Sequence, residues 1–366
     1  MLLKFISIFN MLAKRISLSM IVKNEAPVIK RCLESVRPWI DQWVIVDTGS
    51  TDGTQQLVQE AMAGIPGTLY ERPWIDFAHN RNEALAFARQ NADYVLFIDA
   101  DEQLQLPPGF LWPQLDADGY LFKCILNSTQ YSRNSLISTR RNWAWEGVIH
   151  EYLTCPEPHQ WALLPGPEIH VSRDGARARD PSTYLKDIEV LKKALAKQPG
   201  HPRYTFYFAQ SYRDAGLLSE SLQQYEKRVG LHGWAEETWY AAFQVAVLKE
   251  KLNCSSIDVQ QTYLRAYAMR PGRAEPLYEL SRYLRLQGET PLAHLYALRA
   301  SRLKKTDDLL FVDSSVYEWR ALDELASSAW YAGALEDGRM ACEQLLAEGK
   351  FPETERARIE GNSKFY

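Results

Sequence analysis

The hydrophobic pattern of this 366-residue chain changes its period once, near residue 180, and that change limits the folds available to it. Before this point, short apolar runs alternate with stretches in helical spacing, and after it only helical spacing remains. Strands that alternate with helices predict βαβ units and a mostly parallel sheet, whereas a long stretch without strands predicts a separate helical domain. The sequence therefore predicts an α/β domain followed by an all-α domain.

The boundaries of these parts follow from the change of period. We expect an N-terminal extension at residues 1–14, an α/β domain at residues 15–175 and a helical domain at residues 176–366. The apolar N-terminal stretch is interrupted by Lys4 and Lys14, so it lacks the ~20 consecutive apolar residues of a membrane span. We therefore expect a cytoplasmic protein, with peripheral attachment to the inner face of the membrane as the alternative.

The α/β pattern can be followed strand by strand through the N-terminal part. Strands are expected at residues 15–22, 43–50, 67–74 and 94–100, and helices at residues 25–37, 51–64 and 77–92. In a parallel sheet of this kind, ligands bind beyond the carboxyl ends of the strands. Asp47 and Asp99 both follow apolar strands, so we expect them to share one site.

The helical domain contains an internal repeat. The segments FAQSYRDAGLLSESLQQYEKR and ELSRYLRLQGETPLAHLYALRA carry small residues and a turn glycine in the same register, with Gly216 in the first and Gly288 in the second. This pattern resembles tetratricopeptide (TPR) repeats of about 34 residues. An irregular helical bundle is the alternative. In either arrangement, each helix pair needs its neighbours to bury its apolar face.

The stretch YVLFIDADEQL, residues 94–104, ends an apolar strand in Asp99, Asp101 and Glu102. Two carboxylates about 4 Å apart repel each other by roughly 4 kcal/mol at an effective dielectric constant near 20. A metal ion, an arginine or open water must offset this repulsion. Because residues i and i+2 of a strand point to the same side, Asp99 and Asp101 can meet one hard cation, and oxygen ligands suit Mg²⁺ or Mn²⁺.

Three further motifs contain candidate ligands. VDTGSTDGT places Asp47 at a strand end, followed by glycines that let a ligand approach the backbone. VKNEAP places Glu25 between a strand and a helix, where it can cap the helix or bind the donor. HNRNEAL places Arg81 early in a helix, where it can pair with Asp47 or Asp99 or hold a phosphate.

Taken together, these motifs and their order over residues 15–104 resemble a family 2 glycosyltransferase of the GT-A fold. The resemblance implies that Asp47 and Asp99 contact the nucleoside of a nucleotide-diphosphate sugar, for which we expect a UDP-linked donor. It also implies that Arg81 lies near the nucleotide, and that Asp101 binds the Mn²⁺ or Mg²⁺ that bridges the diphosphate. The expected reaction is sugar transfer with inversion at the anomeric carbon.

The segment WAWEGVIHEYL, residues 143–153, resembles the G-x-x-H-E segment of a bacterial subgroup that couples such a domain to TPR-like helices. An inverting transferase needs a carboxylate or an imidazole to deprotonate the acceptor. Glu151 is our first choice for this base and Glu146 the second. His150 can be the base, a phosphate contact or a third metal ligand beside Asp99 and Asp101.

The same subgroup includes peptide-modifying and envelope-glycan enzymes. The resemblance therefore implies a peptide, protein or glycan acceptor, and a protein partner that the TPR-like helices could bind. Trp143 and Trp145 can stack on a sugar ring or pack in the core, and the sequence does not separate these roles.

Composition and charge disfavour several other classes. The net charge of −4 offers no overall basic surface for nucleic acid, and the five scattered cysteines match neither a zinc site nor a disulfide framework. Two alternative functions remain beside the transferase. One is a TPR-type interaction scaffold with an inactive GT-A domain. The other is a nucleotidyltransferase that forms sugar nucleotides. Enzymes that resemble this class carry a Gly-rich loop after the first strand, and VKNEAP stands at this place instead, which disfavours the class.

Overall fold

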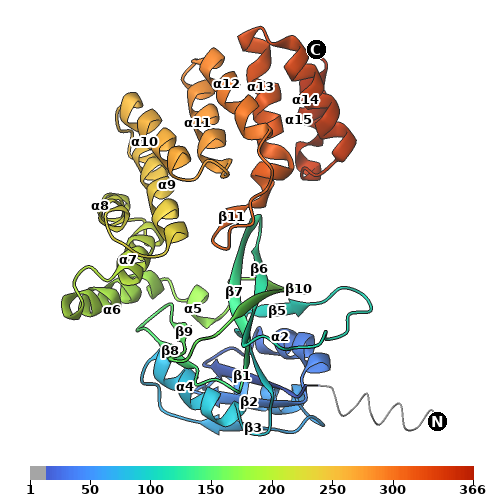
Figure 1. Cartoon of the computed structure of the whole chain (residues 1–366), viewed down its shortest axis with the longest axis vertical. Coiled ribbons are helices and arrows are strands. Elements are labelled where there is room, and N and C mark those ends of the chain that lie inside the picture. Colours follow the sequence, from blue (N-terminus) through green and yellow to red (C-terminus); the bar gives the residue numbers. More distant parts are fainter. Residues whose placement is uncertain (1–13) are drawn as a thin grey trace. The chain divides into compact units, whose positions relative to one another are not determined.

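A computed structural model of the chain describes residues 14–366 (Figure 1). The expected N-terminal extension lies outside this range apart from Lys14. By its internal contacts the chain forms two compact units, of which the second consists of Asn127–Tyr131 and Leu195–Tyr366. Residues 176–194 group with the first unit, although the sequence predicted that the helical domain begins at residue 176. Among residues 14–366, no helix has both the length and the apolar character of a membrane span.

The first unit is built on a mixed sheet, which confirms the predicted α/β class. The order of its strands is β3 (Gly67–Glu71), β2 (Gln42–Asp47), β1 (Ile16–Val22), β4 (Tyr94–Phe97), β7 (Thr129–Ser138), β6 (Gly119–Leu126), β10 (Trp161–Val171) and β5 (Glu102–Gln105). The strands β3, β2, β1 and β4 are parallel, whereas β4 pairs with β7 and β10 pairs with β5 in antiparallel fashion. The short strands β8 (Ala144–Glu146) and β9 (Tyr152–Thr154) form a separate antiparallel pair.

The parallel strands are connected by helices, as the alternating pattern predicted. These are α2 (Ile29–Val36), α3 (Thr54–Ala61) and α4 (Phe77–Ala88). Helix α2 buries Ile29, Cys32, Leu33 and Val36, which recur at helical spacing and so form one apolar face. Helix α4 packs against β1 and β2. It begins after Asp76, whose carboxylate accepts a hydrogen bond from the backbone N–H of His79 at 2.7 Å.

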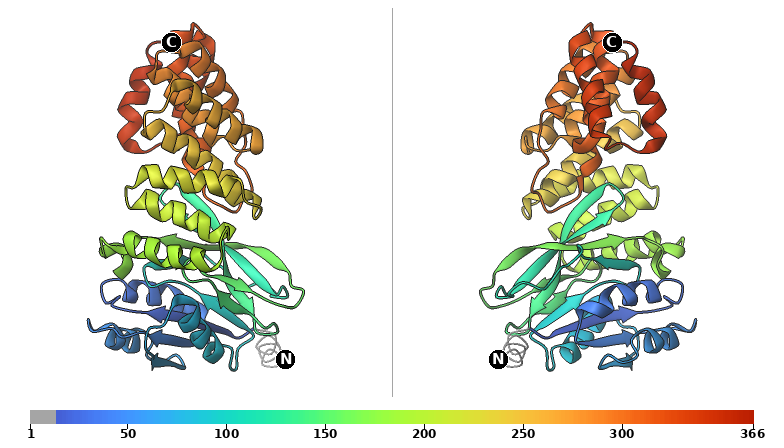
Figure 2. Two further views of the ribbon diagram at one scale, coloured as in Figure 1. Left: turned by 90° about the vertical axis from the view of Figure 1, so that its left-hand side faces the viewer. Right: turned by 90° about the vertical axis from the view of Figure 1, so that its right-hand side faces the viewer.

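The described part of the second unit consists mainly of antiparallel helix pairs (Figures 1 and 2). The pairs are α7 (Pro202–Asp214) with α8 (Leu218–Val229), α9 (Ala235–Lys251) with α10 (Ser256–Met269), α11 (Glu275–Leu286) with α12 (Thr290–Ser301), and α13 (Ala321–Ala332) with α14 (Leu335–Glu348). In the chain they are preceded by α5 (Ala176–Arg179) and α6 (Thr183–Lys197), which belong to the first unit up to Ala194, and followed by α15 (Arg356–Ser363). Each pair packs against the next one along the chain, as expected for TPR-like repeats.

Small residues of the predicted repeat lie where the paired helices touch. In the first copy, the Ser221 hydroxyl donates to the carbonyl oxygen of Ala209 at 2.8 Å. In the second copy, the Ser281 hydroxyl donates to the carbonyl oxygen of Ala293 at 2.7 Å. All four residues are fully buried. The same two positions are thus hydrogen-bonded in both copies, with donor and acceptor exchanged, which confirms the predicted register.

The segment between α12 and α13 folds back against α9 and α11. The Glu236 carboxylate of α9 accepts hydrogen bonds from the backbone N–H groups of Leu309 and Leu310, both at 2.8 Å. Strand β11 (Val312–Asp313) pairs with residues 129 and 130, which belong to the same unit. Part of the face formed by α9 and α11 is therefore occupied by the chain itself.

Arg273 holds this segment in place from a fully buried position. Its guanidinium donates to Glu275 at 2.8 Å and to Asp308 at 3.1 Å, and its central carbon lies 3.8 Å from the centre of the Trp239 ring. It also donates to the carbonyl oxygen of Phe311 at 2.8 Å. Only 1% of the Arg273 side chain is exposed. Asp308 also binds Arg270 at 2.5 Å, whereas among the described residues the buried Glu275 carboxylate has Arg273 as its only cation.

Replacing Arg273 with alanine is expected to lower the free energy of unfolding of the helical unit by roughly 3–5 kcal/mol, because it leaves the buried Glu275 carboxylate without its counter-charge. At roughly 2–4 °C per kcal/mol, the midpoint of thermal unfolding should fall by about 6–20 °C. The matched control is Arg339→Ala, since Arg339 also binds two glutamates but lies on the surface. Equal unfolding midpoints for the two variants would contradict the structural role given to Arg273.

Candidate functional site

The carboxyl end of β4 holds a network of acids and arginines around Asp99. One Asp99 oxygen accepts a hydrogen bond from Arg81 at 2.7 Å, and the other accepts one from Arg133 at 3.3 Å. Burial by itself would raise the pKa of Asp99, but the two positive charges outweigh it and lower this pKa to about 2. Two arginines therefore offset the negative charge of Asp99, which keeps 40% of its side-chain surface exposed.

Glu102 has a structural role in the same network. Its carboxylate binds Arg133 at 2.9 Å and accepts the backbone N–H of Asp99, also at 2.9 Å. Its side chain is only 3% exposed, and this burial raises the pKa of Glu102 even though Arg133 lies beside it. Glu102 thus fixes the turn that follows β4 and orients Arg133 towards Asp99.

Arg81 joins two of the predicted site segments. While one of its nitrogens binds Asp99, its Nε donates to Oε1 of Glu151, and its guanidinium lies 5.2 Å from the centre of the Trp145 ring. The side chains of Arg81 and Glu151 are 13% and 9% exposed. Within residues 14–366, no hydrogen bond reaches the second oxygen of Glu151, Oε2. Glu151 is therefore oriented by Arg81 and retains one free acceptor atom.

The two neighbours of Arg81 on α4 position other segments of the site. Asn82 binds the backbone of Trp145 twice, donating to its carbonyl at 2.9 Å and accepting its N–H at 2.8 Å. Asn80 is fully buried, donates to the carbonyl of Pro73 and accepts the N–H of Ile75, both at 3.0 Å. Three consecutive residues of one helix thus fix three other segments of the first unit. Sequence reasoning singled out only Arg81, although two asparagines in one turn of a helix against the sheet were a signal for buried polar contacts.

Asp101 and Glu25 are brought together by the backbone of residues 175 and 176. Glu25 accepts the N–H of Ala176 at 2.9 Å, and a Cβ on Gly175 would stand 3.1 Å from the Asp101 carboxylate. Burial raises the pKa of Asp101, and the charge of Asp99 adds to this effect. Burial also raises the pKa of Glu25 to about 7. The charge of Asp101 adds to this rise, whereas the hydrogen bond from the Ala176 N–H opposes it. Burial and the neighbouring acids make the ionised forms of Asp101 and Glu25 unfavourable, and a bound cation would stabilise them.

Asp101 can supply one carboxylate ligand to a divalent cation, but the described residues do not supply a full set of ligands. Among residues 14–366, no three His, Cys, Asp or Glu side chains are placed so that they could hold a metal ion, so Asp99, Asp101 and His150 do not form such a group. Both oxygens of Asp99 already bind arginines. His150 lies exposed in a left-handed backbone conformation, at φ = 51°.

Asp47 lies at the carboxyl end of β2 and is 1% exposed. Its Oδ1 accepts the N–H groups of Gly49 and Ser50 at 2.9 and 2.8 Å, and the side chain of Gln55 donates to it at 3.2 Å. Its Oδ2 is buried and has no hydrogen-bond partner in the structure. A buried carboxylate oxygen without a partner is costly, so this atom is suited to accept a hydrogen bond from a ligand.

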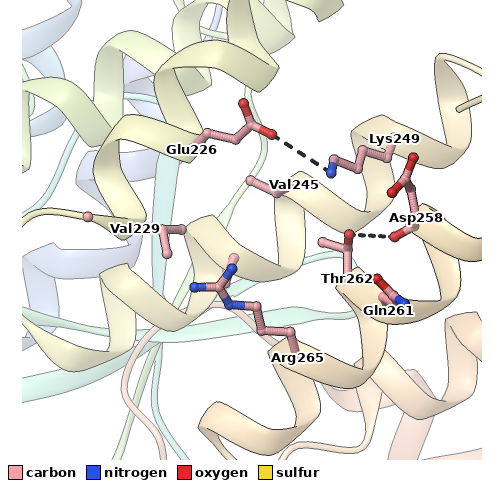
Figure 3. Close-up of a pocket in the computed structure, with 10 residues that line it drawn as sticks. Glu226, Val229, Val245, Lys249, Asp258, Gln261, Thr262 and Arg265 are labelled. Carbon is pink, nitrogen blue, oxygen red and sulfur yellow. Dashed lines mark hydrogen bonds and ion pairs between the residues drawn. The ribbon is translucent and has the colours of Figure 1, made fainter.

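Asp47 is part of the wall of a cavity of about 290 Å³. The other lining residues are Gly49, Ser50, Gln55, Glu71, Arg72 and Pro73. A larger cavity of about 510 Å³ lies in the helical unit, between α8, α9 and α10 (Figure 3). Its wall includes the ion pair of Glu226 and Lys249, at 3.9 Å, and none of the predicted site residues. The chemistry of the site therefore points to the smaller cavity.

The comparisons with known proteins agree with this geometry. Residues 17–117 match the model of glycosyl transferase family 2. These residues form a family 2 glycosyltransferase domain. It contains Glu25, Asp47, Arg81, Asp99 and Asp101, whereas the segment with Glu146, His150 and Glu151 follows it in the chain.

Curated relatives extend the similarity beyond this glycosyltransferase domain. A TPR repeat-containing protein of Synechococcus elongatus is 31% identical over 76% of this chain and 64% of its own length. The SPbeta prophage-derived glycosyltransferase SunS of Bacillus subtilis is 33% identical over 58% of this chain and 53% of its own length. The lipopolysaccharide core biosynthesis glycosyltransferase LpsC of Rhizobium meliloti is 38% identical over 27% of this chain and 36% of its own length. The chain spans less than two thirds of each of these relatives.

The aromatic and acidic residues that follow the glycosyltransferase domain divide into buried and exposed groups. Trp143 and Trp145 are 3% and 8% exposed and pack in the core with Phe97 and Leu153, so core packing accounts for both. Glu146 is exposed on β8 and accepts a hydrogen bond from the Thr154 hydroxyl at 2.8 Å. Of the two candidate carboxylate bases, Glu151 is the one joined through Arg81 to Asp99 at the end of β4.

Proposed function

We propose that this chain is a metal-dependent glycosyltransferase. It moves a sugar from a nucleotide-diphosphate donor, UDP-linked by our expectation, to an acceptor, with inversion at the anomeric carbon. The observation that carries this proposal is the buried, unpartnered oxygen of Asp47 in the wall of a cavity within a family 2 domain. A nucleoside can supply the N–H or O–H group that this oxygen lacks.

The donor is held at three places in this proposal. Asp47 accepts a hydrogen bond from the nucleoside of the donor, and the exposed part of the Asp99 side chain contacts the ribose of that nucleoside. Arg81 and Glu25 lie towards the phosphates. Asp101 would hold Mn²⁺ or Mg²⁺, with phosphate oxygens of the donor as the other ligands. When bound, this cation neutralises the charge that develops on the departing diphosphate.

Glu151 serves as the base that removes the proton from the acceptor. Its Oε1 is held by Arg81, so its Oε2 can face the acceptor while the side chain stays fixed. A positioned base of this kind accelerates such reactions by roughly 10²–10⁴-fold. Glu146 and His150 remain the second choices for the base, and His150 can also contact the phosphates.

The acceptor is a peptide, a protein or an envelope glycan. The name of LpsC, which refers to lipopolysaccharide core biosynthesis, favours the glycan. The TPR-like unit can bind a protein partner or the acceptor, but the part of its α9–α11 face that holds residues 308–313 is not free for this purpose.

A thermal-shift panel with UDP, GDP, CDP and dTDP, each with and without Mn²⁺, tests the proposal. A ligand at 100 times its Kd stabilises the protein by about 2.7 kcal/mol, which corresponds to roughly 5–10 °C for a domain of this size. We expect such a shift for one nucleotide, UDP, and only in the presence of Mn²⁺. If no nucleotide shifts the unfolding midpoint, the interaction scaffold becomes the better description of this protein.

A further inference from the structure

Two large apolar side chains are exposed directly beside the cavity that contains Asp47. Trp74 is 42% exposed and Ile75 is 56% exposed. Pro73, which precedes them, lines the cavity together with Arg72. Large exposed apolar groups next to a polar cavity are typical of a surface that a ligand covers.

The backbone on both sides of Trp74 is fixed. The fully buried Asn80 donates to the carbonyl of Pro73 and accepts the N–H of Ile75, both at 3.0 Å. The Trp74 ring contacts Phe77 edge-on, with 4.8 Å between the ring centres. The buried Asn80 side chain therefore fixes the loop in a conformation that keeps Trp74 at the surface.

The cavity itself lacks a surface of the kind that Trp74 provides. Its wall consists of polar or small side chains apart from Pro73, and it contains no aromatic ring. A nucleobase has hydrogen-bonding groups along its edge and a flat apolar face, and proteins commonly stack that face on an aromatic side chain. Asp47 offers an acceptor for the edge. Two aromatic residues directly adjoin the cavity wall in sequence, Tyr70 and Trp74. Tyr70 is half-buried and stacks on Phe87 with 4.1 Å between the ring centres, so the exposed ring is that of Trp74.

We propose that Trp74 is the stacking surface for the nucleobase of the donor, whose ring N–H group binds the Asp47 carboxylate. This inference rests on the proposed function and deepens it. It assigns the exposed loop 73–75 to the donor and not to the acceptor, and it restricts the donor to a nucleoside diphosphate with a ring N–H donor, as in uracil, thymine or guanine.

Affinity measurements on Trp74 variants test this assignment. The probes are the nucleoside diphosphate that binds the wild-type protein and inorganic pyrophosphate, each with Mn²⁺. Stacking on a base contributes enough that Trp74→Ala should weaken nucleotide binding by roughly 5- to 150-fold. Trp74→Phe should retain most of the affinity, Trp74→Leu should not, and pyrophosphate binding should change by less than about twofold.

The control variant is Trp330→Ala, which removes a tryptophan of similar exposure, 44%, from the helical unit and should leave both affinities unchanged. Unchanged nucleotide affinity in Trp74→Ala would overturn the inference, as would an equal loss for nucleotide and pyrophosphate. A raised KM for the acceptor with normal nucleotide binding would assign Trp74 to the acceptor instead. If the wild-type protein binds no nucleotide, the proposed function fails together with the inference.

Discussion

Replacing Asp101 with asparagine is expected to abolish the Mn²⁺-dependent binding of the nucleotide and to lower sugar transfer by roughly 10²–10⁴-fold, since a bound cation contributes several kcal/mol to stabilising the transition state. The fold should be unaffected. Because burial and the charge of Asp99 raise the pKa of Asp101, its ionised form destabilises the folded protein at neutral pH. A neutral amide removes this effect, so the unfolding midpoint without ligands should stay the same or rise.

The two readouts for Asp101 therefore move in opposite directions, which separates a ligand role from a structural one. Thermal unfolding with and without nucleotide and Mn²⁺ measures both. Glu34→Gln is a suitable control, because Glu34 is an exposed acid on α2 whose one ion pair within residues 14–366 is with Lys30, at 3.8 Å. An Mn²⁺-dependent shift of normal size in Asp101→Asn would show that another group holds the cation.

Replacing Glu151 with glutamine is expected to leave the affinity for the nucleotide unchanged and to lower the rate of transfer by roughly 10²–10⁴-fold. The amide oxygen can still accept the hydrogen bond from Arg81, so the side chain keeps its position, but it cannot take up a proton. Nucleotide affinity and the rate of transfer to a supplied acceptor, measured on one preparation, separate these effects.

The matched control for this variant is Glu146→Gln. Glu146 is exposed and binds only the Thr154 hydroxyl among the described residues, and we expect this variant to transfer sugar normally. Full activity in Glu151→Gln would move the role of base to Glu146 or to His150. Loss of nucleotide binding in Glu151→Gln would instead indicate that the pair of Arg81 and Glu151 shapes the donor site.

Local sequence patterns predicted the parallel part of the sheet well. The strand expected at residues 15–22 is β1 (Ile16–Val22), and the strand expected at residues 94–100 is β4 (Tyr94–Phe97). The helix expected from residue 25 begins at Ile29, because the N–H groups of Val28 and Ile29 bind the carbonyl of Glu25 and form a turn first. The strands after residue 100 were not predicted, since β5 and β6 pair with the distant β10 and their local patterns are weak.

The sequence by itself determined that the acids of the site lie at the carboxyl ends of the parallel strands. Apolar strands end in Asp47, Asp99 and Asp101, and parallel strands bring their carboxyl ends to one edge of a sheet. It also determined the helical repeat, because small residues must recur wherever paired helices touch. Both conclusions depend on local periodicity, which a sequence displays directly.

Only the tertiary structure decided what neutralises these acids and which aromatic rings remain exposed. Asp99 binds Arg81, 18 residues before it, and Arg133, 34 residues after it. The sequence left Trp143 and Trp145 open between stacking on a sugar and packing in the core, and the structure buries both, whereas Trp74 is exposed next to the cavity that contains Asp47. Charge compensation and burial depend on distances through space between segments far apart in the chain, and the local pattern around each residue does not contain those distances.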